Sequence, residues 1–311
     1  MNGIAKLQPT PLGLGCWPLG GDQWGRQDDR DSLATIQRAF EEGINHFDTA
    51  QAYGRGHGEE LVGKALHPVR DKAFVATKIL YMPKEKVEKE VAFSLKRLQT
   101  EIIDLLYIHW PKKGGDLAGM MEAMERLREK GQIRRIGVSN FSVAQMQEVM
   151  KAGKIDVHQL CYNVLWRREE RETIPFCRQH GISVITYSSL AEGILTGKFG
   201  KEPDFAPSDH RKYTLLFEKE VWPKVHETVE KLKSIAIEAK RPLAHCAIRW
   251  LVAQDGIVSV LAGSRTPDQV SGNVKSLEGT IDQSVFRAMT AVTDDFAPFI
   301  PDAGNIFRWY P

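Results

Sequence analysis

The feature that most constrains the fold is a regular alternation of short apolar runs with longer amphipathic segments along the 311-residue chain. The runs are rich in β-branched residues, as strands are, and the charges of each following segment fall on one side of a helix. The eight predicted strands are Leu12–Trp17, Ile44–Thr49, Ala73–Ile79, Ile103–Trp110, Arg134–Ser139, Val157–Asn163, Ser183–Ser188 and Val258–Gly263. The predicted helices are Asp31–Glu42, Glu59–Leu66, Lys84–Leu98, Leu117–Lys130, Ser142–Lys151, Glu170–His180, Trp222–Lys240, Leu243–Gln254, a helix starting at Pro267 with Thr266 as N-cap, and Asp282–Val292.

The strand runs are almost continuously apolar, which indicates a parallel sheet covered on both faces. Eight strand–helix alternations favour a closed barrel over an open doubly wound sheet. The open sheet of dinucleotide-binding proteins would also need a GxGxxG turn that opens a helix, and Pro18 stands where the third glycine of the turn after Gly13 belongs. We therefore predict an α/β protein, a (β/α)8 TIM barrel that forms a single domain over residues 1–311. It has an extra helix, Leu243–Gln254, before the last strand, and a C-terminal helix and tail.

Composition excludes several classes of function. With 42 basic and 40 acidic residues the net charge is +2, so the chain lacks the large excess of positive charge that is typical of nucleic-acid-binding proteins. No apolar stretch has the length of a membrane span and no charged-then-apolar leader opens the chain, so we expect a cytoplasmic protein with no membrane partner. Cys16, Cys161, Cys177 and Cys246 form no CxxC pair, and we expect buried reduced thiols and no metal site.

Polar residues end several of the predicted strands, where the catalytic face of such a barrel lies. Asp48 ends the second run, Lys78 the third and His109 the fourth, and Tyr53 follows Asp48 in the next loop. A lysine in an apolar strand needs a partner, and Asp48 is the obvious one. A unit charge about 4 Å from a phenol is worth roughly 4 kcal/mol at an effective dielectric of about 20. We therefore predict that Lys78 lowers the pKa of Tyr53 and makes it a proton donor to a carbonyl oxygen.

Seven further motifs occur in an order that resembles the aldo-keto reductase family. The matching segments, which with the N-terminal LGLGCWPLGGDQWG span roughly Leu12 to Asn273, are GINHFDTAQAYGRGHGEELVGKAL, VATKI, LLYIHWP, IGVSNF, QLCYN, TYSSLAEGILTGKF and LAGSRTPDQVSGN. The N-terminal segment is most similar to bacterial general stress and sugar-oxidising members. This resemblance implies an NADP(H)-dependent enzyme that passes a hydride reversibly between nicotinamide and an aldehyde, ketone or sugar carbonyl.

The resemblance also implies roles for individual residues. Tyr53 matches the general acid, Asp48 and Lys78 the pair that tunes it, and His109 the residue that orients the carbonyl. The implied cofactor-binding residues are Trp17, Ser139, Asn140, Gln159, Tyr187, Ser188, Leu190, Gly193, Leu195, Gly263, Ser264, Arg265, Gln269 and Asn273. Gln269 stands where a basic residue is frequent in the family, so the preference for a 2′-phosphate rests mainly on Arg265.

Aromatic residues supply candidate pocket walls, namely Trp17, Trp24, Trp110 and Trp166, and plain packing is the alternative role for Trp166. The aromatic tail, Phe307, Trp309 and Tyr310, closes either the pocket or the side of the barrel.

Two other classes of function stay open. One is a cofactor-binding regulatory or redox-sensing subunit, since the β subunits of voltage-gated potassium channels resemble the same family. The other is a barrel hydrolase or metalloenzyme. We expect a small-molecule carbonyl or alcohol as substrate; its identity and the oligomeric state do not follow from the sequence.

Overall fold

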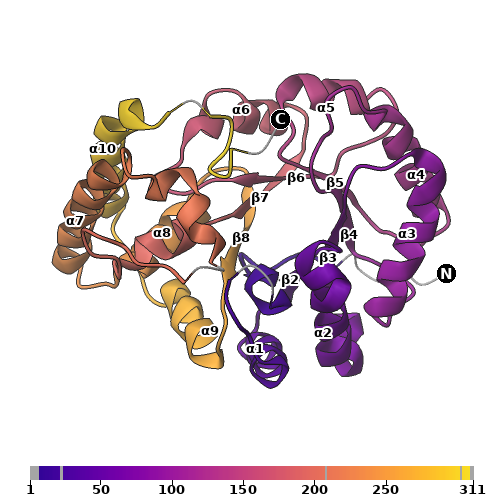
Figure 1. Cartoon of the computed structure of the whole chain (residues 1–311), viewed down its shortest axis with the longest axis horizontal. Coiled ribbons are helices and arrows are strands. Elements are labelled where there is room, and N and C mark those ends of the chain that lie inside the picture. Colours follow the sequence, from indigo (N-terminus) through magenta and orange to yellow (C-terminus); the bar gives the residue numbers. More distant parts are fainter. Residues whose placement is uncertain (1–6, 22–23, 207–208, 302, 309–311) are drawn as a thin grey trace.

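The computed structural model describes residues 7–21, 24–206, 209–301 and 303–308. Over these residues, eight parallel strands pair in chain order and β8 pairs back onto β1, which closes a barrel (Figure 1). The strands are β1 (Leu12–Gly15), β2 (His46–Asp48), β3 (Phe74–Ile79), β4 (Leu105–Ile108), β5 (Ile136–Ser139), β6 (Val157–Cys161), β7 (Ser183–Tyr187) and β8 (Ile257–Gly263). Each corresponds to one predicted run, and the predicted (β/α)8 barrel is confirmed.

The strands separate two apolar cores, which explains why their sequences are apolar on both faces. A large core between strands and helices contains residues such as Val75 and Leu106. A smaller core fills the barrel interior and comes from alternate strand positions, because successive side chains of a strand point to opposite faces. Its buried members are Phe74, Ala76, Leu105, Tyr107, Val157, Ile185 and Leu261. The next inward positions toward the carboxyl ends of β3 and β4 are Lys78 and His109, so polar groups lie directly above an apolar floor.

The helices surround the barrel (Figure 1). They are α1 (Asp29–Glu41), α2 (His57–Leu66), α3 (Lys84–Arg97), α4 (Leu117–Glu129), α5 (Val143–Val149), α6 (Thr173–Gln179), α7 (Trp222–Glu238), α8 (Leu243–Val252), α9 (Pro267–Val274) and α10 (Gln283–Phe296). The predicted N-cap is confirmed, since the Thr266 hydroxyl accepts a hydrogen bond from the Gln269 amide. The extra helix before the last strand is α8. The C-terminal helix is longer than predicted because the buried Phe296 continues its apolar face.

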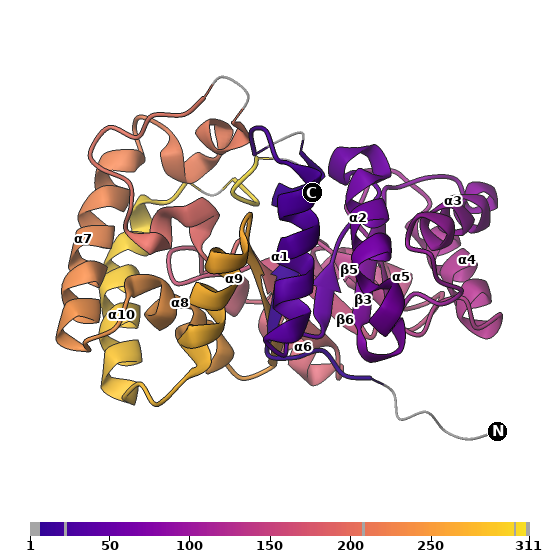
Figure 2. The ribbon, with the colours of Figure 1, turned by 90° about the horizontal axis from the view of Figure 1, so that it is seen from below.

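Figure 2 shows α7 and α10 packed side by side, and α1 packed beside α9. The second of these contacts joins the helix that follows β1 to the helix that follows β8. It places the residues that follow β8 beside the loop that precedes α1.

Close backbone contact joins the loops after β1 and β2. The 3₁₀ turn η1 (Trp17–Gly20) lies against the 3₁₀ turn η2 (Tyr53–Gly56), and a Cβ atom on Gly54 would be 2.4 Å from the carbonyl oxygen of Gly20. Gly54 also has a φ of 59°, which glycine adopts without strain. Glycine at these two positions therefore lets the turns carrying Trp17 and Tyr53 approach each other.

No helix among the described residues is long and apolar enough to cross a membrane. All four cysteines are buried and unpaired. Within the described ranges, no group of three His, Cys, Asp or Glu side chains is arranged to hold a metal ion.

Candidate active site

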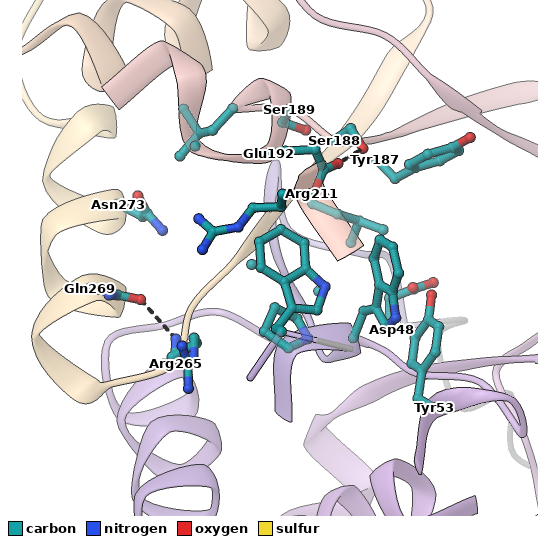
Figure 3. Close-up of a pocket in the computed structure, with 18 of the residues that line it drawn as sticks. Asp48, Tyr53, Tyr187, Ser188, Ser189, Glu192, Arg211, Arg265, Gln269 and Asn273 are labelled. Atoms are coloured by element: carbon teal, nitrogen blue, oxygen red, sulfur yellow. Dashed lines mark hydrogen bonds between the residues drawn. The ribbon is translucent and has the colours of Figure 1, made fainter. Parts of the chain in front are cut away.

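A cavity of about 820 Å³ opens at the carboxyl ends of the strands (Figure 3). Most of the predicted site residues line this one cavity although they come from all parts of the chain. The lining members of the predicted set are Trp17, Trp24, Asp48, Tyr53, His109, Trp110, Ser139, Asn140, Gln159, Tyr187, Ser188, Leu190, Gly193, Gly263, Arg265, Gln269 and Asn273.

Three predicted site residues do not line the cavity. Lys78 lies behind Tyr53 and Asp48 and is only 1% exposed. Leu195 is fully buried in the 3₁₀ turn η5 (Ala191–Thr196), and its side chain belongs to the outer apolar core. The Ser264 hydroxyl is also buried and accepts a hydrogen bond of 3.1 Å from Asn273 Nδ2. The side chains of Leu195 and Ser264 therefore point into the protein interior and not into the cavity. Ser264 contacts the cavity lining through its hydrogen bond with Asn273.

The Lys78 ammonium joins three groups at the top of the barrel interior. It forms an ion pair with Asp48 Oδ1, donates to the Thr49 carbonyl oxygen at 2.9 Å and lies 3.2 Å from the Tyr53 hydroxyl oxygen. Asp48 Oδ2 accepts a further hydrogen bond of 2.8 Å from Gln159 Nε2. Gln159 thus holds the carboxylate that holds Lys78.

Burial and charge act in opposite directions on this group. Burial alone would lower the pKa of Lys78, but the Asp48 carboxylate and the Tyr53 hydroxyl together raise it above its ordinary value. Lys78 is therefore a cation at neutral pH.

The structure corrects the predicted direction for Tyr53. Burial raises the pKa of the Tyr53 phenol above its ordinary value, and the Lys78 ammonium, which is the strongest opposing influence, does not reverse this. The prediction counted the attraction of the ammonium but not the cost of removing a phenolate from water. Tyr53 is accordingly protonated at neutral pH.

His109 lies beside Tyr53 at the cavity wall. Their ring centroids are 5.9 Å apart and the planes are nearly perpendicular, at 80°. Burial, with the nearby Lys78 charge, lowers the pKa of His109 well below its ordinary value, so the imidazole is neutral. Its buried Nδ1 atom has no hydrogen-bond partner among the described residues. A neutral imidazole can donate or accept one hydrogen bond at each ring nitrogen.

A hydrogen-bonded group lies next to this pair, where β5 and β7 end. The Tyr187 hydroxyl donates to Asn140 Oδ1 at 2.6 Å, and Asn140 Nδ2 donates to the carbonyl oxygen of His109 at 3.2 Å and to Ser139 Oγ at 3.0 Å. Asn140 has a φ of 63°, a left-handed conformation that asparagine tolerates better than most residues. This network fixes the Tyr187 ring at the cavity wall.

Aromatic rings form the other walls. Trp17 stacks near Tyr53 with centroids 6.2 Å apart, and it meets Trp24 edge-on at 5.4 Å. From the tail, Phe307 meets Trp17 edge-on at 5.6 Å and lies parallel to Tyr187 at 6.3 Å. Phe307 therefore closes the cavity, whereas Trp309 and Tyr310 lie outside the described residues. Trp166 is buried in the outer core and does not line the cavity, so of its two candidate roles the structure supports packing.

The loop after β7 has a left-handed backbone over much of its length. Ser188, Ala191, Glu192 and Gly193 have φ values of 51°, 48°, 56° and 91°. Such strain is concentrated at ligand-binding segments, and successive amides in turns of this kind form anion-binding concavities. Figure 3 shows this loop on one side of the cavity and Arg265, Gln269 and Asn273 on the other.

The loop before α1 holds Arg265 in place through Gln27. Arg265 Nε donates to Gln27 Oε1 at 2.9 Å, and Gln27 Nε2 donates to the Arg265 carbonyl oxygen at 2.9 Å. Gln269 Oε1 accepts from the Arg265 backbone amide at 2.8 Å.

Three charged residues of the cavity were not predicted. Arg211 pairs with the buried Asp209, with its Nη2 atom 2.5 Å from Oδ2, and its guanidinium lies 5.2 Å from the centroid of the Trp24 ring. Burial lowers the pKa of Lys198, and the neighbouring charges of Arg211 and Arg265 contribute. Glu192 is the third. The 198–222 loop that carries Lys198 and Arg211 has no sequence periodicity, and only the GKF that ends the TYSSLAEGILTGKF motif could have drawn attention to Lys198.

Comparison with known proteins agrees with this geometry. The model of the aldo/keto reductase family matches residues 11–294. The chain belongs to the aldo/keto reductase family. The protein is therefore an oxidoreductase of a family that acts on carbonyl groups with a nicotinamide cofactor.

Individual relatives of this aldo/keto reductase span nearly its whole length. It is 35% identical to the aldo-keto reductase YhdN of Bacillus subtilis (strain 168), over 85% of this chain and 84% of the relative. It is 32% identical to an NADH-specific methylglyoxal reductase of Escherichia coli (strain K12), over 88% and 92%. Its structure resembles that of a glycerol dehydrogenase of Gluconobacter oxydans, with a TM-score of 0.84, 32% identity and coverage of 93% of both chains.

We expect Tyr53 in the isolated protein to titrate at a higher pH than a free tyrosine side chain, and Lys78→Met to raise its pKa further, because the ammonium is the strongest influence that favours the phenolate. NMR of ring-labelled tyrosine, with Tyr53 assigned by Tyr53→Phe, measures this. Lys112→Met is the matched control, since exposed Lys112 lies 5.1 Å from the Tyr81 ring and not near Tyr53. A Tyr53 signal that titrates at a lower pH than a free tyrosine side chain, or that Lys78→Met leaves unchanged, would contradict the assignment.

Proposed function

We propose that this aldo/keto reductase is an NADP(H)-dependent enzyme that reversibly reduces an aldehyde, ketone or sugar carbonyl, with Tyr53 as general acid. One observation carries the proposal: the Tyr53 hydroxyl lies 3.2 Å from a buried lysine ammonium, at a cavity wall that it shares with a neutral histidine. A buried ammonium is costly to withdraw from water, and here one of its donors is directed at a phenol that lines the cavity.

The residues present fit a nicotinamide adenine dinucleotide phosphate. The lining of one cavity includes both Tyr53 and Asn273, and it also includes the left-handed loop after β7, a kind of backbone that forms anion-binding concavities. Three cations, Lys198, Arg211 and Arg265, lie close enough to one another for their charges to interact, an arrangement that an anion would relieve. At the nicotinamide end, we assign Ser139, Asn140 and Gln159 to the carboxamide and Tyr187 to the ring. We assign the 188–193 loop, with Lys198 and Arg211, to the pyrophosphate. Arg265, Gln269 and Asn273 are assigned to the adenosine 2′-phosphate.

When bound, the cofactor supplies the hydride that adds to the carbonyl carbon. Tyr53 transfers its hydroxyl proton to the carbonyl oxygen, so the carbonyl becomes an alcohol and the phenol becomes a phenolate. The Lys78 ammonium stabilises that phenolate, and Asp48, held by Gln159, keeps the ammonium in place. The neutral His109 orients the carbonyl oxygen by a hydrogen bond. A proton from solvent then restores Tyr53. The reverse sequence oxidises an alcohol.

The raised pKa of Tyr53 suits the acid role. A general acid must carry its proton when the substrate binds, and Tyr53 carries it throughout the neutral range. Transfer is driven when negative charge develops on the substrate oxygen, and the adjacent ammonium stabilises the products of that step.

Tyr53→Phe should abolish most turnover and preserve cofactor binding, because the hydroxyl is removed and the ring that packs near Trp17 is retained. We expect NADPH oxidation to fall by about 100- to 10,000-fold, the usual contribution of a positioned general acid. The assay follows NADPH absorbance against a panel of aldehydes, ketones and aldoses, with Kd for NADPH from fluorescence. Tyr213→Phe is the control, since Tyr213 is exposed and does not line the main cavity.

Turnover that survives in Tyr53→Phe would remove the mechanism. Tight NADPH binding by the unmodified protein without turnover of any member of the panel would instead favour a regulatory, cofactor-sensing subunit.

Arg265→Met should weaken NADPH binding selectively. Charge-assisted hydrogen bonds are worth about 1.5–3 kcal/mol, which corresponds to a roughly 10- to 100-fold increase in Kd. Kd for NADH, which lacks the 2′-phosphate, should stay unchanged and serves as the matched control. The comparison matters because the relative from E. coli is named as NADH-specific. Equal losses for the two cofactors would contradict the assignment of Arg265.

A further inference from the structure

Glu192 is a buried acid in the wall of the proposed cofactor cavity. Its side chain is 6% exposed, and it lines both the main cavity and an adjoining cavity of about 300 Å³ (Figure 3). Its backbone is left-handed, with φ at 56°, and the Ser188 hydroxyl donates a hydrogen bond to its Oε1. No ion pair in the described part of the chain involves Glu192. A carboxylate held in this way is poorly compensated.

Charges around Glu192 act in both directions. The Arg211 guanidinium favours the carboxylate, and Asp209 disfavours it. The titratable and charged groups that act on Glu192 or lie in neighbouring segments are Arg211, Asp209, Lys198, Tyr187 and Cys161. The others that share its two cavities are Asp48, Tyr53, His109, His245, Arg265, His210 and Tyr213. Arg211 is already paired with Asp209, so its charge is only partly available to Glu192.

We infer that Glu192 couples cofactor binding to proton uptake: its carboxylate faces the pyrophosphate segment of the cavity and takes a proton from solvent when a dinucleotide binds. This inference rests on the proposed cofactor site. The 188–193 loop that would cradle the two phosphate charges is the loop that carries Glu192.

Three physical terms support the coupling. Burial raises the pKa of Glu192 to about 7, so protonation at neutral pH is nearly free of cost. A pyrophosphate in the same cavity adds two negative charges, which disfavour the carboxylate further. Once protonated, the carboxyl group gains a donor and can hydrogen-bond to a phosphate oxygen.

The sign of the pH dependence follows. Because the bound state holds the proton more tightly than the free state, affinity is highest when Glu192 is already protonated and falls as pH rises past about 7. If the bound state holds the proton about a hundredfold more tightly than the free state, or more, Kd should rise about tenfold between pH 6 and pH 8, with uptake of about half a proton at pH 7.

Isothermal calorimetry of NADPH binding tests this in the full-length protein. Titrations at pH 6, 7 and 8, in pairs of buffers with different heats of ionisation, give both Kd and the number of protons taken up. Glu192→Gln should bind NADPH as tightly as the unmodified protein at pH 6 and about tenfold more tightly at pH 8, without the proton uptake. Subtracting the proton uptake of Glu192→Gln from that of the unmodified protein cancels the protons that belong to the ligand, including those of its 2′-phosphate.

Two variants are matched controls. Glu169→Gln removes another acid whose pKa is raised by burial but which lines neither cavity, and His210→Gln removes a titratable neighbour in the adjoining cavity. Both should keep the proton uptake of the unmodified protein.

Equal pH dependence in the unmodified protein and in Glu192→Gln would overturn the inference, and so would binding without proton uptake by the unmodified protein, a measurement that does not depend on any variant. NADPH that fails to bind at every pH to every protein would overturn the proposed function itself. The two failures are therefore distinguishable.

Discussion

The site depends on the burial of one ammonium group inside a barrel whose inner core is mostly apolar. Lys78 is almost fully buried above an apolar floor that includes Tyr107, and a cation there is tolerable only with a bound anion. Asp48 supplies that anion from the neighbouring strand, and Gln159 fixes its second oxygen from across the barrel. The ion pair has lone pairs and protons left for further partners, and Tyr53 is the one that faces the cavity. Barrel closure therefore places a phenol beside a fixed positive charge.

Electrostatics divide the cavity into two regions. Around Tyr53 the groups are neutral or paired, since His109 is uncharged and Lys78 is matched by Asp48, and the walls are aromatic. Toward Asn273 the cavity is bordered by Lys198, Arg211 and Arg265, with Glu192 as an acid among cations. The first region suits a neutral carbonyl group, and the second suits a molecule with several phosphates. The left-handed loop after β7 lines the same cavity.

Sequence reasoning succeeded where the signal was local and periodic. All eight strands and the Thr266 N-cap follow from patterns of a few residues, and the strand-end rule brought Asp48, Lys78 and His109 to one end of the barrel. It was wrong about the pKa of Tyr53, because the desolvation of a phenol depends on how deeply the fold buries it, and burial is not readable from spacing. Lys198, Arg211 and Glu192 were missed since irregular loops place them. Leu195 and Ser264 fell within matching motifs, but the backbone turns their side chains toward the protein. The single-domain boundary stays a prediction.

The central claim is direct hydride transfer to a carbonyl at Tyr53. It is tested most directly by a single turnover with NADPH deuterated at both C4 positions, followed by mass spectrometry of the alcohol. The account predicts one deuterium on the carbinol carbon and none elsewhere in the product. An alcohol that contains no deuterium, formed at the same rate as with unlabelled NADPH, would contradict the account, because the hydride would then have come from another source.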